Sequence, residues 1–97
     1  MQIERIEDGS RGAYTVAKGG DTDEMTYSVA GTERIIIDHT VVPDAFRGEG
    51  VGKALVERAV TDARAEGRRI LPLCTFAAAQ FRRNPDWADV LDMGGRT

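Results

Sequence analysis

The chain has 97 residues, which is enough for one domain with one hydrophobic core and too few for two. A hydrophobic content of 41% and a charged content of 30% are typical of a globular protein, and they argue against disorder throughout the chain. The net charge of −3 offers no electrostatic basis for binding nucleic acid or an anionic membrane surface.

The N-terminus lacks the apolar segment of a secretory signal, and no apolar run is long enough to cross a bilayer, so we expect a cytoplasmic protein. The single cysteine, Cys74, excludes an internal disulfide and has no cysteine or histidine companions with which to build a structural zinc site. We therefore expect no metal. Cys74 should contribute either to packing or to chemistry.

The first third of the chain predicts antiparallel strands. Residues 3–8 carry a short alternating pattern, and residues 12–18 are rich in strand-forming side chains. A Gly-Gly-Asp turn at 19–21 leads into residues 25–30, where apolar and small polar residues alternate. The last two segments predict a hairpin with one solvent-exposed face.

Residues 33–42 predict a strand in the middle of the sheet. Three consecutive isoleucines and a pair of valines indicate that both of its faces are covered. Strict alternation would place four of its side chains together on one face: Ile35, Ile37, His39 and Val41.

The second half of the chain predicts a crossover unit. An amphipathic helix begins at Val51 and ends at Gly67, and residues 69–73 predict a strand parallel to the strand at 33–42. Pro72 favours an edge position for this last strand, because proline cannot donate a ladder hydrogen bond.

Two short helices are expected to close the chain. The first spans residues 75–83, and the second follows Asn84-Pro85, with Asn84 expected to cap it. The predicted fold is therefore α/β in the α+β sense, with a mixed sheet that is mostly antiparallel and contains one parallel βαβ pair.

The loop before the long helix reads Arg47-Gly48-Glu49-Gly50-Val51-Gly52. Its glycines let the backbone approach a ligand, and the first N–H groups of a helix point unpaired at the positive end of the helix dipole. The loop thus predicts a phosphate site. The spacing excludes a Walker A loop, because only three residues separate Gly48 from Gly52-Lys53, and the G-x-G-x-G order excludes a dinucleotide fingerprint.

Cys74 and His39 are the candidates for chemistry. Both lie toward the carboxyl ends of the two parallel strands, the edge at which α/β folds bind ligands, so we expect them to converge with the glycine loop. Cys74 is either a small buried hydrophobe or a thiol activated at a helix start. His39 is either a core histidine or a proton acceptor.

The motif R-x-x-G-x-G at residues 47–52, placed between a buried strand and a helix, resembles the pyrophosphate-binding motif of GNAT-type N-acetyltransferases. The resemblance extends over residues 12–92, from His39-Thr40-Val41-Val42-Pro43 to Leu71-Pro72-Leu73-Cys74 and Arg83-Asn84-Pro85. Over that span the chain is similar to a family of half-sized, stand-alone GNAT-like proteins.

The resemblance implies a single GNAT-like domain over residues 1–97 that uses acetyl-CoA and transfers its acetyl group to an unidentified amine acceptor, either directly or through Cys74 with His39 beside it. We expect a monomer or weak homodimer. The alternatives are a non-catalytic acyl-CoA-binding module and a partner-binding domain that has kept only the fold.

Lys53 either contacts the coenzyme or lies on a solvated helix face. Asn84 either contacts the coenzyme or caps a helix. The implied coenzyme-binding residues are Val41, Val42, Arg47, Gly48, Glu49, Gly50, Val51, Gly52, Lys53 and Asn84.

Overall fold

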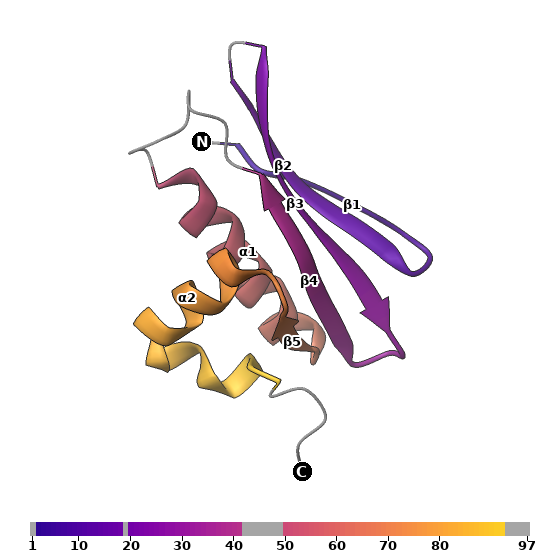
Figure 1. Cartoon of the computed structure of the whole chain (residues 1–97). Helices are drawn as coiled ribbons and strands as arrows, with labels where there is room; N and C mark the ends of the chain where they lie inside the picture. The colour runs from indigo at the N-terminus through magenta and orange to yellow at the C-terminus, as the bar shows by residue number, and fades with distance from the viewer. Residues whose placement is uncertain (1, 19, 42–49, 93–97) are drawn as a thin grey trace.

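The computed structural model describes residues 2–18, 20–41 and 50–92 (Figure 1). The elements in chain order are β1 (Glu4–Asp8), β2 (Arg11–Lys18), β3 (Asp21–Ala30), β4 (Arg34–Val41), α1 (Val51–Glu66), β5 (Arg69–Pro72), α2 (Thr75–Arg83) and the 3-10 helix η2 (Pro85–Val90). The helices lie together on one side of the sheet that the strands form (Figure 1).

The sheet has the order β1-β2-β3-β4-β5. The first three pairs are antiparallel and the β4–β5 pair is parallel, which confirms the predicted mixed sheet, the β2–β3 hairpin and the parallel crossover pair. β3 begins at Asp21 rather than at residue 25, because the ladder with β2 continues through polar residues up to the turn. β5 is the last strand, and a single bridge joins Ile70 to Leu91 on its outer side.

The core lies between the sheet and the helices. α1 ends at Gly67, whose left-handed φ of 70° and N–H bond to the Ala63 carbonyl form the predicted C-terminal stop. Phe81 and Trp87 pack edge to face with ring centroids 5.4 Å apart, which fixes η2 on α2. The core cluster comprises Tyr14, Val16, Met25, Tyr27, Ile35, Ile37, Val51, Leu55, Val56, Ala59, Val60, Ala63, Ile70, Ala77, Phe81, Trp87 and Val90.

The expectation that both faces of β4 are covered is wrong. Ile35 and Ile37 are buried under the helices, whereas Ile36, on the opposite face, is only half-buried. The apolar run reflects the strand's place between β3 and β5 rather than a second layer, since the described helices all lie on one side (Figure 1).

β4 also contains a β-bulge that reverses the predicted orientation of its end. Tyr27 of β3 pairs with Ile37, but the preceding residue, Thr26, pairs with His39, so Asp38 has no counterpart. From this point the alternation shifts by one residue. Thr40, opposite buried Met25, faces the helices, while His39 turns to the exposed face, so the expectation that His39 shares the Ile37 face is wrong.

β1 is tied to α1 by a network around Arg5. The Arg5 guanidinium lies 5.4 Å from the Tyr14 ring centroid and 5.9 Å from that of Tyr27, and it donates to Glu66 at 2.6 Å. The Tyr14 hydroxyl donates to Asp62 of α1 at 2.8 Å. These contacts hold the outer hairpin, formed by β1 and β2, against the C-terminal end of α1.

None of the described helices is long and apolar enough to cross a membrane.

Gly12 is predicted to be the most sensitive position of the outer hairpin. It pairs with Tyr27, and a Cβ at this position would lie 2.3 Å from Cζ of that ring. Gly12→Ala must displace Tyr27, and it should lower the free energy of unfolding by about 2 kcal/mol. The measurement is urea denaturation, with exposed Arg11→Ala as a control expected to stay within about 0.5 kcal/mol of wild type. Equal stabilities of Gly12→Ala and wild type would contradict the packing.

Candidate active site

Cys74 lies between β5 and α2, at the N-cap of the helix, with an extended backbone (φ −68°, ψ 128°). Its Sγ donates a hydrogen bond to Oγ1 of Thr40 at 3.4 Å. The N–H groups of Leu73 and Cys74 both donate to the Ile37 carbonyl at 3.2 Å, so the residue is also anchored to β4 through the main chain. The bulge is what brings Thr40 to this position, because without it Thr40 would lie on the exposed face.

The surroundings of Cys74 favour its thiolate. Partial burial raises the pKa of the thiol, but the Thr40 hydroxyl and the backbone N–H groups of Ala77, Phe76 and Thr40 lower it, and the resulting pKa is below the ordinary value. Two of these N–H groups belong to the first turn of α2, where they have no partner within the helix. Cys74 is therefore half-buried, oriented and more acidic than a free cysteine.

The N-terminus of α1 has no cap of its own. Gly50 occupies the N-cap position with φ 70°, no side chain caps the helix, and its first turn contains no acidic residue. The first helical hydrogen bond runs from Ala54 N–H to the Gly50 carbonyl, which leaves the N–H groups of the preceding residues without partners in the helix. No described residue lies within 4 Å of a Cβ built on Gly50, so among these residues none blocks the approach of an anion to the N–H groups.

Gly52 brings the starts of the two helices together. A Cβ on Gly52 would lie 2.6 Å from Cζ of Phe76, in the first turn of α2. The absence of a side chain at Gly52 lets the Phe76 ring pack against α1, and Phe76 is only two residues from Cys74. Sequence reasoning assigned Gly52 to the phosphate loop alone; the structure gives it a packing role as well.

Beyond Ile37, β4 is paired on one side only. The β4–β5 register ends at Ile37 and Pro72, while the β3–β4 register continues to Val41. Within the described residues, the β5-facing backbone groups from Asp38 to Val41 have no strand partner. This open edge lies at the same end of the sheet as the start of α1 (Figure 1), and Cys74 contacts Thr40 within it.

Asp23 is an unexpected member of this end of the sheet. It is completely buried, and neither carboxylate oxygen has a hydrogen-bond partner among the described residues. Burial raises its pKa to about 6, and the nearby Glu24 N–H, which does not reach hydrogen-bond geometry, lowers it somewhat. A carboxylate buried without a partner is costly, so its retention calls for an explanation.

The predicted site residues are thus divided. Cys74, Gly50 and Val51 lie at the common end of the sheet, and Val51 is buried, so only its backbone can serve a ligand. Val42, Arg47, Gly48 and Glu49 lie outside the described residues.

The remaining predicted residues have the following surroundings. Lys53 is exposed on α1, and Val41 is exposed on the open face of the sheet. His39 points to that same open face, on the side of β4 opposite to the Thr40–Cys74 pair. Its role in proton transfer stays a prediction. Asn84 occupies the predicted N-cap position of η2, and its carbonyl accepts the Trp87 N–H at 2.9 Å. Its side chain does not cap η2, because Nδ2 donates to the Gln80 carbonyl of α2 at 2.8 Å.

Three residues of the site escaped sequence reasoning. Thr40 was missed because a bulge leaves no mark in the alternation, and Phe76 because its partner, Gly52, had already been explained as part of the loop. Asp23 could have been found: the alternation of Tyr27 and Met25, extended by two residues, places a carboxylate on the apolar face.

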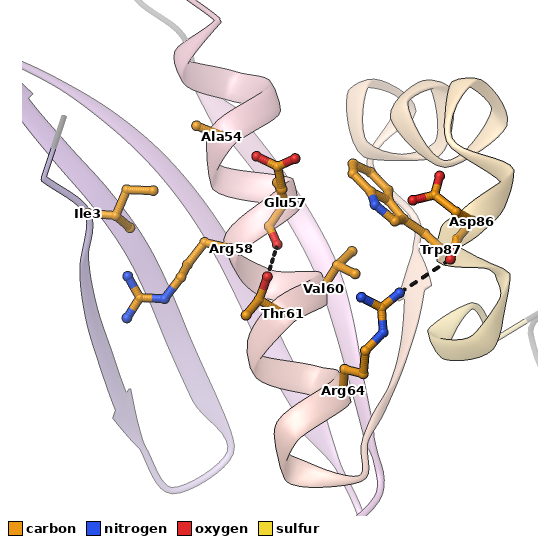
Figure 2. A pocket seen from close by; sticks show the side chains of 9 residues that line it. All are labelled: Ile3, Ala54, Glu57, Arg58, Val60, Thr61, Arg64, Asp86 and Trp87. Carbon is orange, nitrogen blue, oxygen red and sulfur yellow. Dashed lines mark hydrogen bonds between the residues drawn. The ribbon is translucent and has the colours of Figure 1, made fainter.

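A cavity of about 640 Å³ in the described part of the chain lies elsewhere. Figure 2 shows it along the outer side of α1, with Arg58 and Arg64 projecting into it. Both cations are already engaged, Arg58 with Asp62 and Arg64 with Asp89. The full lining is Ile3, Ala54, Glu57, Arg58, Val60, Thr61, Arg64, Asp86 and Trp87. The cavity contains none of the residues around Cys74.

No group of three or more His, Cys, Asp and Glu side chains in the described ranges could hold a metal ion.

The fold and this site define a GCN5-related N-acetyltransferase domain. The model of that family, described as GCN5-related N-acetyl-transferase, matches residues 13–90, and the chain belongs to the family.

Known relatives agree with this assignment. Protein NATD1 of Xenopus tropicalis is 31% identical over 84 residues, which is 84% of this chain and 77% of that protein. Protein NATD1 of Bos taurus is 32% identical over 84 residues, covering 84% of this chain and 74% of that protein. The solution structure of a GCN5-like protein from Staphylococcus aureus superimposes with a TM-score of 0.67 at 28% identity, covering 96% of this chain and 94% of the other.

Thr40 is predicted to control the reactivity of Cys74. Thr40→Val keeps the side-chain volume but removes the hydroxyl, so the pKa of Cys74 should rise and its alkylation by iodoacetamide at pH 7.5 should slow about three- to tenfold. The measurement is the alkylation rate as a function of pH.

Two controls accompany this measurement. Thr40→Ser keeps the hydroxyl and should preserve the pH profile. His39→Ala should also leave the profile unchanged, because His39 lies on the other face of β4. An unaltered profile in Thr40→Val would show that Thr40 does not tune the thiol.

Proposed function

We propose that the protein binds acetyl-CoA and transfers its acetyl group to an amine acceptor, with Cys74 as the reactive group. The observation that carries the proposal is the uncapped N-terminus of α1, placed by the Gly52–Phe76 contact beside the acidified thiol of Cys74. An anion-binding helix start next to a nucleophile suits a ligand that contains both a diphosphate and a thioester. Membership of the N-acetyltransferase family supports acetyl transfer.

Each part of the site would serve a different part of the ligand. The N–H groups at the start of α1, with Arg47 to Gly52 as the surrounding loop, would hold the diphosphate, and Lys53 would lie near its charge. The open edge of β4 from Asp38 to Val41 offers backbone donors and acceptors to the amide-containing arm of the coenzyme. Acetyl-CoA, when bound, supplies the acetyl group as an activated thioester.

Cys74 would act in one of two ways. As a thiolate it can take the acetyl group itself and pass it to the amine, or it can line the site of a direct transfer. In both routes the Thr40 hydroxyl holds the sulfur in position and stabilises its negative charge. A non-catalytic acyl-CoA-binding module is the second candidate.

Gly50 is predicted to be required for acetyl-CoA binding. Gly50→Val places a side chain in the open space at the start of α1, and the dissociation constant for acetyl-CoA, measured by isothermal titration calorimetry, should rise at least about tenfold. Gly31→Val is a matched control, because Gly31 has the same φ of 70° and the same open surroundings in the turn after β3. Both variants carry the same backbone strain, but only Gly50→Val should lose affinity.

The absence of any heat of binding in the wild type would rule out acetyl-CoA as a ligand. Retained affinity in Gly50→Val would rule out this loop as the place where acetyl-CoA binds.

The route of transfer is distinguished by intact-mass spectrometry. After incubation with acetyl-CoA, the wild type is expected to carry one acetyl group on Cys74, and Cys74→Ala should carry none. Release of CoA that depends on an added amine and persists in Cys74→Ala would indicate direct transfer. Binding of acetyl-CoA with neither acetylation nor amine-dependent release would establish the non-catalytic module instead.

A further inference from the structure

Asp23 is a buried carboxylate that neither the packing of the core nor the proposed acetyl-CoA site explains. Its side chain is completely buried on the helix-facing side of β3, and both oxygens lack hydrogen-bond partners among the described residues. The core needs no acid here, since an apolar side chain would fill the space without the cost of burying a charge. The group is better explained by a partner that the described part of the fold does not provide.

The strand register places Asp23 close to Thr40 and Cys74. Asp23 and Met25 are successive residues on the same face of β3, and Met25 is directly opposite Thr40. Thr40 is therefore the diagonal neighbour of Asp23 on the adjacent strand, with Cα atoms about 7–8 Å apart. The Cys74 sulfur lies 3.4 Å from the Thr40 hydroxyl. The carboxylate and the thiol thus flank Thr40 on the same side of the sheet.

No described side chain on this face balances the charge of Asp23. Across β2 it is opposite Val16, along β3 it is next to Met25, and on β4 it is diagonal to Thr40. The residues of α1 in the same core cluster are apolar, and the Cys74 thiol beyond Thr40 can itself only become negative. A cation is the partner that would offset the charge of the ionised carboxylate.

A metal ion does not fit this position. Divalent cations need several oxygen, nitrogen or sulfur ligands, and no group of three or more such acidic or metal-binding side chains exists in the described residues. A single carboxylate is instead suited to one organic ammonium group, which supplies its own N–H donors.

We propose that Asp23 receives the acceptor amine: the carboxylate pairs with the acceptor's ammonium group and removes the proton that blocks nucleophilic attack. This inference rests on the proposed acetyl transfer and specifies its acceptor as a cationic primary amine. Asp23 has no accessible surface in this structure, so the side chains over it must separate to admit the amine nitrogen. A narrow, unbranched –CH2–NH3+ group fits that requirement, and a branched or secondary amine does not.

The proton balance of the step is complete. The ammonium gives one proton to the Asp23 carboxylate, and the freed nitrogen lone pair forms a C–N bond to the acetyl carbonyl carbon while the C–S bond of the thioester breaks. The second proton leaves the nitrogen and ends on the departing thiolate. The products are the N-acetylated amine, the free thiol and protonated Asp23, which returns its proton to solvent.

The first test measures the carboxyl group directly in the wild-type protein. The 13C resonance of the Asp23 side chain is titrated with pH, alone and with n-butylamine, tert-butylamine or n-butanol. The n-butylammonium ion should lower the pKa of Asp23 by about one or more, because a nearby opposite charge favours the ionised carboxylate. The branched amine and the neutral alcohol should leave the pKa unchanged. An Asp23 titration that n-butylamine does not alter overturns the proposal.

The second test measures transfer. With n-butylamine as acceptor, Asp23→Asn should raise the KM for the amine at least tenfold and leave the affinity for acetyl-CoA within twofold of wild type. Asp21→Asn is the matched control, since Asp21 lies two residues earlier in β3 and is exposed; both constants should stay at wild-type values. A wild-type KM in Asp23→Asn overturns the proposal. Failure of the wild type to bind acetyl-CoA would instead remove the proposed function, and the carboxyl titration would still decide whether Asp23 binds an ammonium ion.

Discussion

The site depends on one extra residue in β4. Because Asp38 has no counterpart on β3, the alternation of side chains shifts, and Thr40 rather than His39 turns toward the helices. The Thr40 hydroxyl then meets the sulfur of Cys74, and the Ile37 carbonyl before the bulge anchors the main chain of Leu73 and Cys74. Pairing between β4 and β5 ends at the same point. One local irregularity therefore orients the thiol and leaves the strand edge beside it open.

Two helices begin at this end of the sheet, and each leaves unpaired N–H groups there. Those of α2 lower the pKa of Cys74, whereas those of α1 begin at Gly50, where no described residue lies within 4 Å of a built Cβ. The contact between Gly52 and Phe76 holds the two helix starts together. The same glycine-rich segment thus contributes to packing and carries the proposed anion site, so a substitution at Gly52 is expected to affect both.

The two ends of α1 differ in how the nearby charged groups are paired. The opposite end of α1 is held by the charged network of Arg5 with Glu66 and the tyrosine rings, in which each ionic group has partners. Asp23, by contrast, is buried without a hydrogen-bond partner in the part of the chain that the structure describes. Residues that fold alone does not explain tend to mark functional sites, because a group selected for its chemistry can be retained at a cost to stability.

The amino-acid sequence by itself determined the order of elements, the parallel crossover, the helix at Val51 and the location of Cys74 at the start of α2, because periodicity, glycine stops and apolar runs are local properties. It also identified the family through the glycine loop. The faces of His39 and Thr40, the contact of Phe76 with Gly52 and the unpaired state of Asp23 were decided only by the tertiary structure. A bulge depends on how two strands pair, and a missing partner depends on every element packed around it, so neither can be deduced from one segment alone.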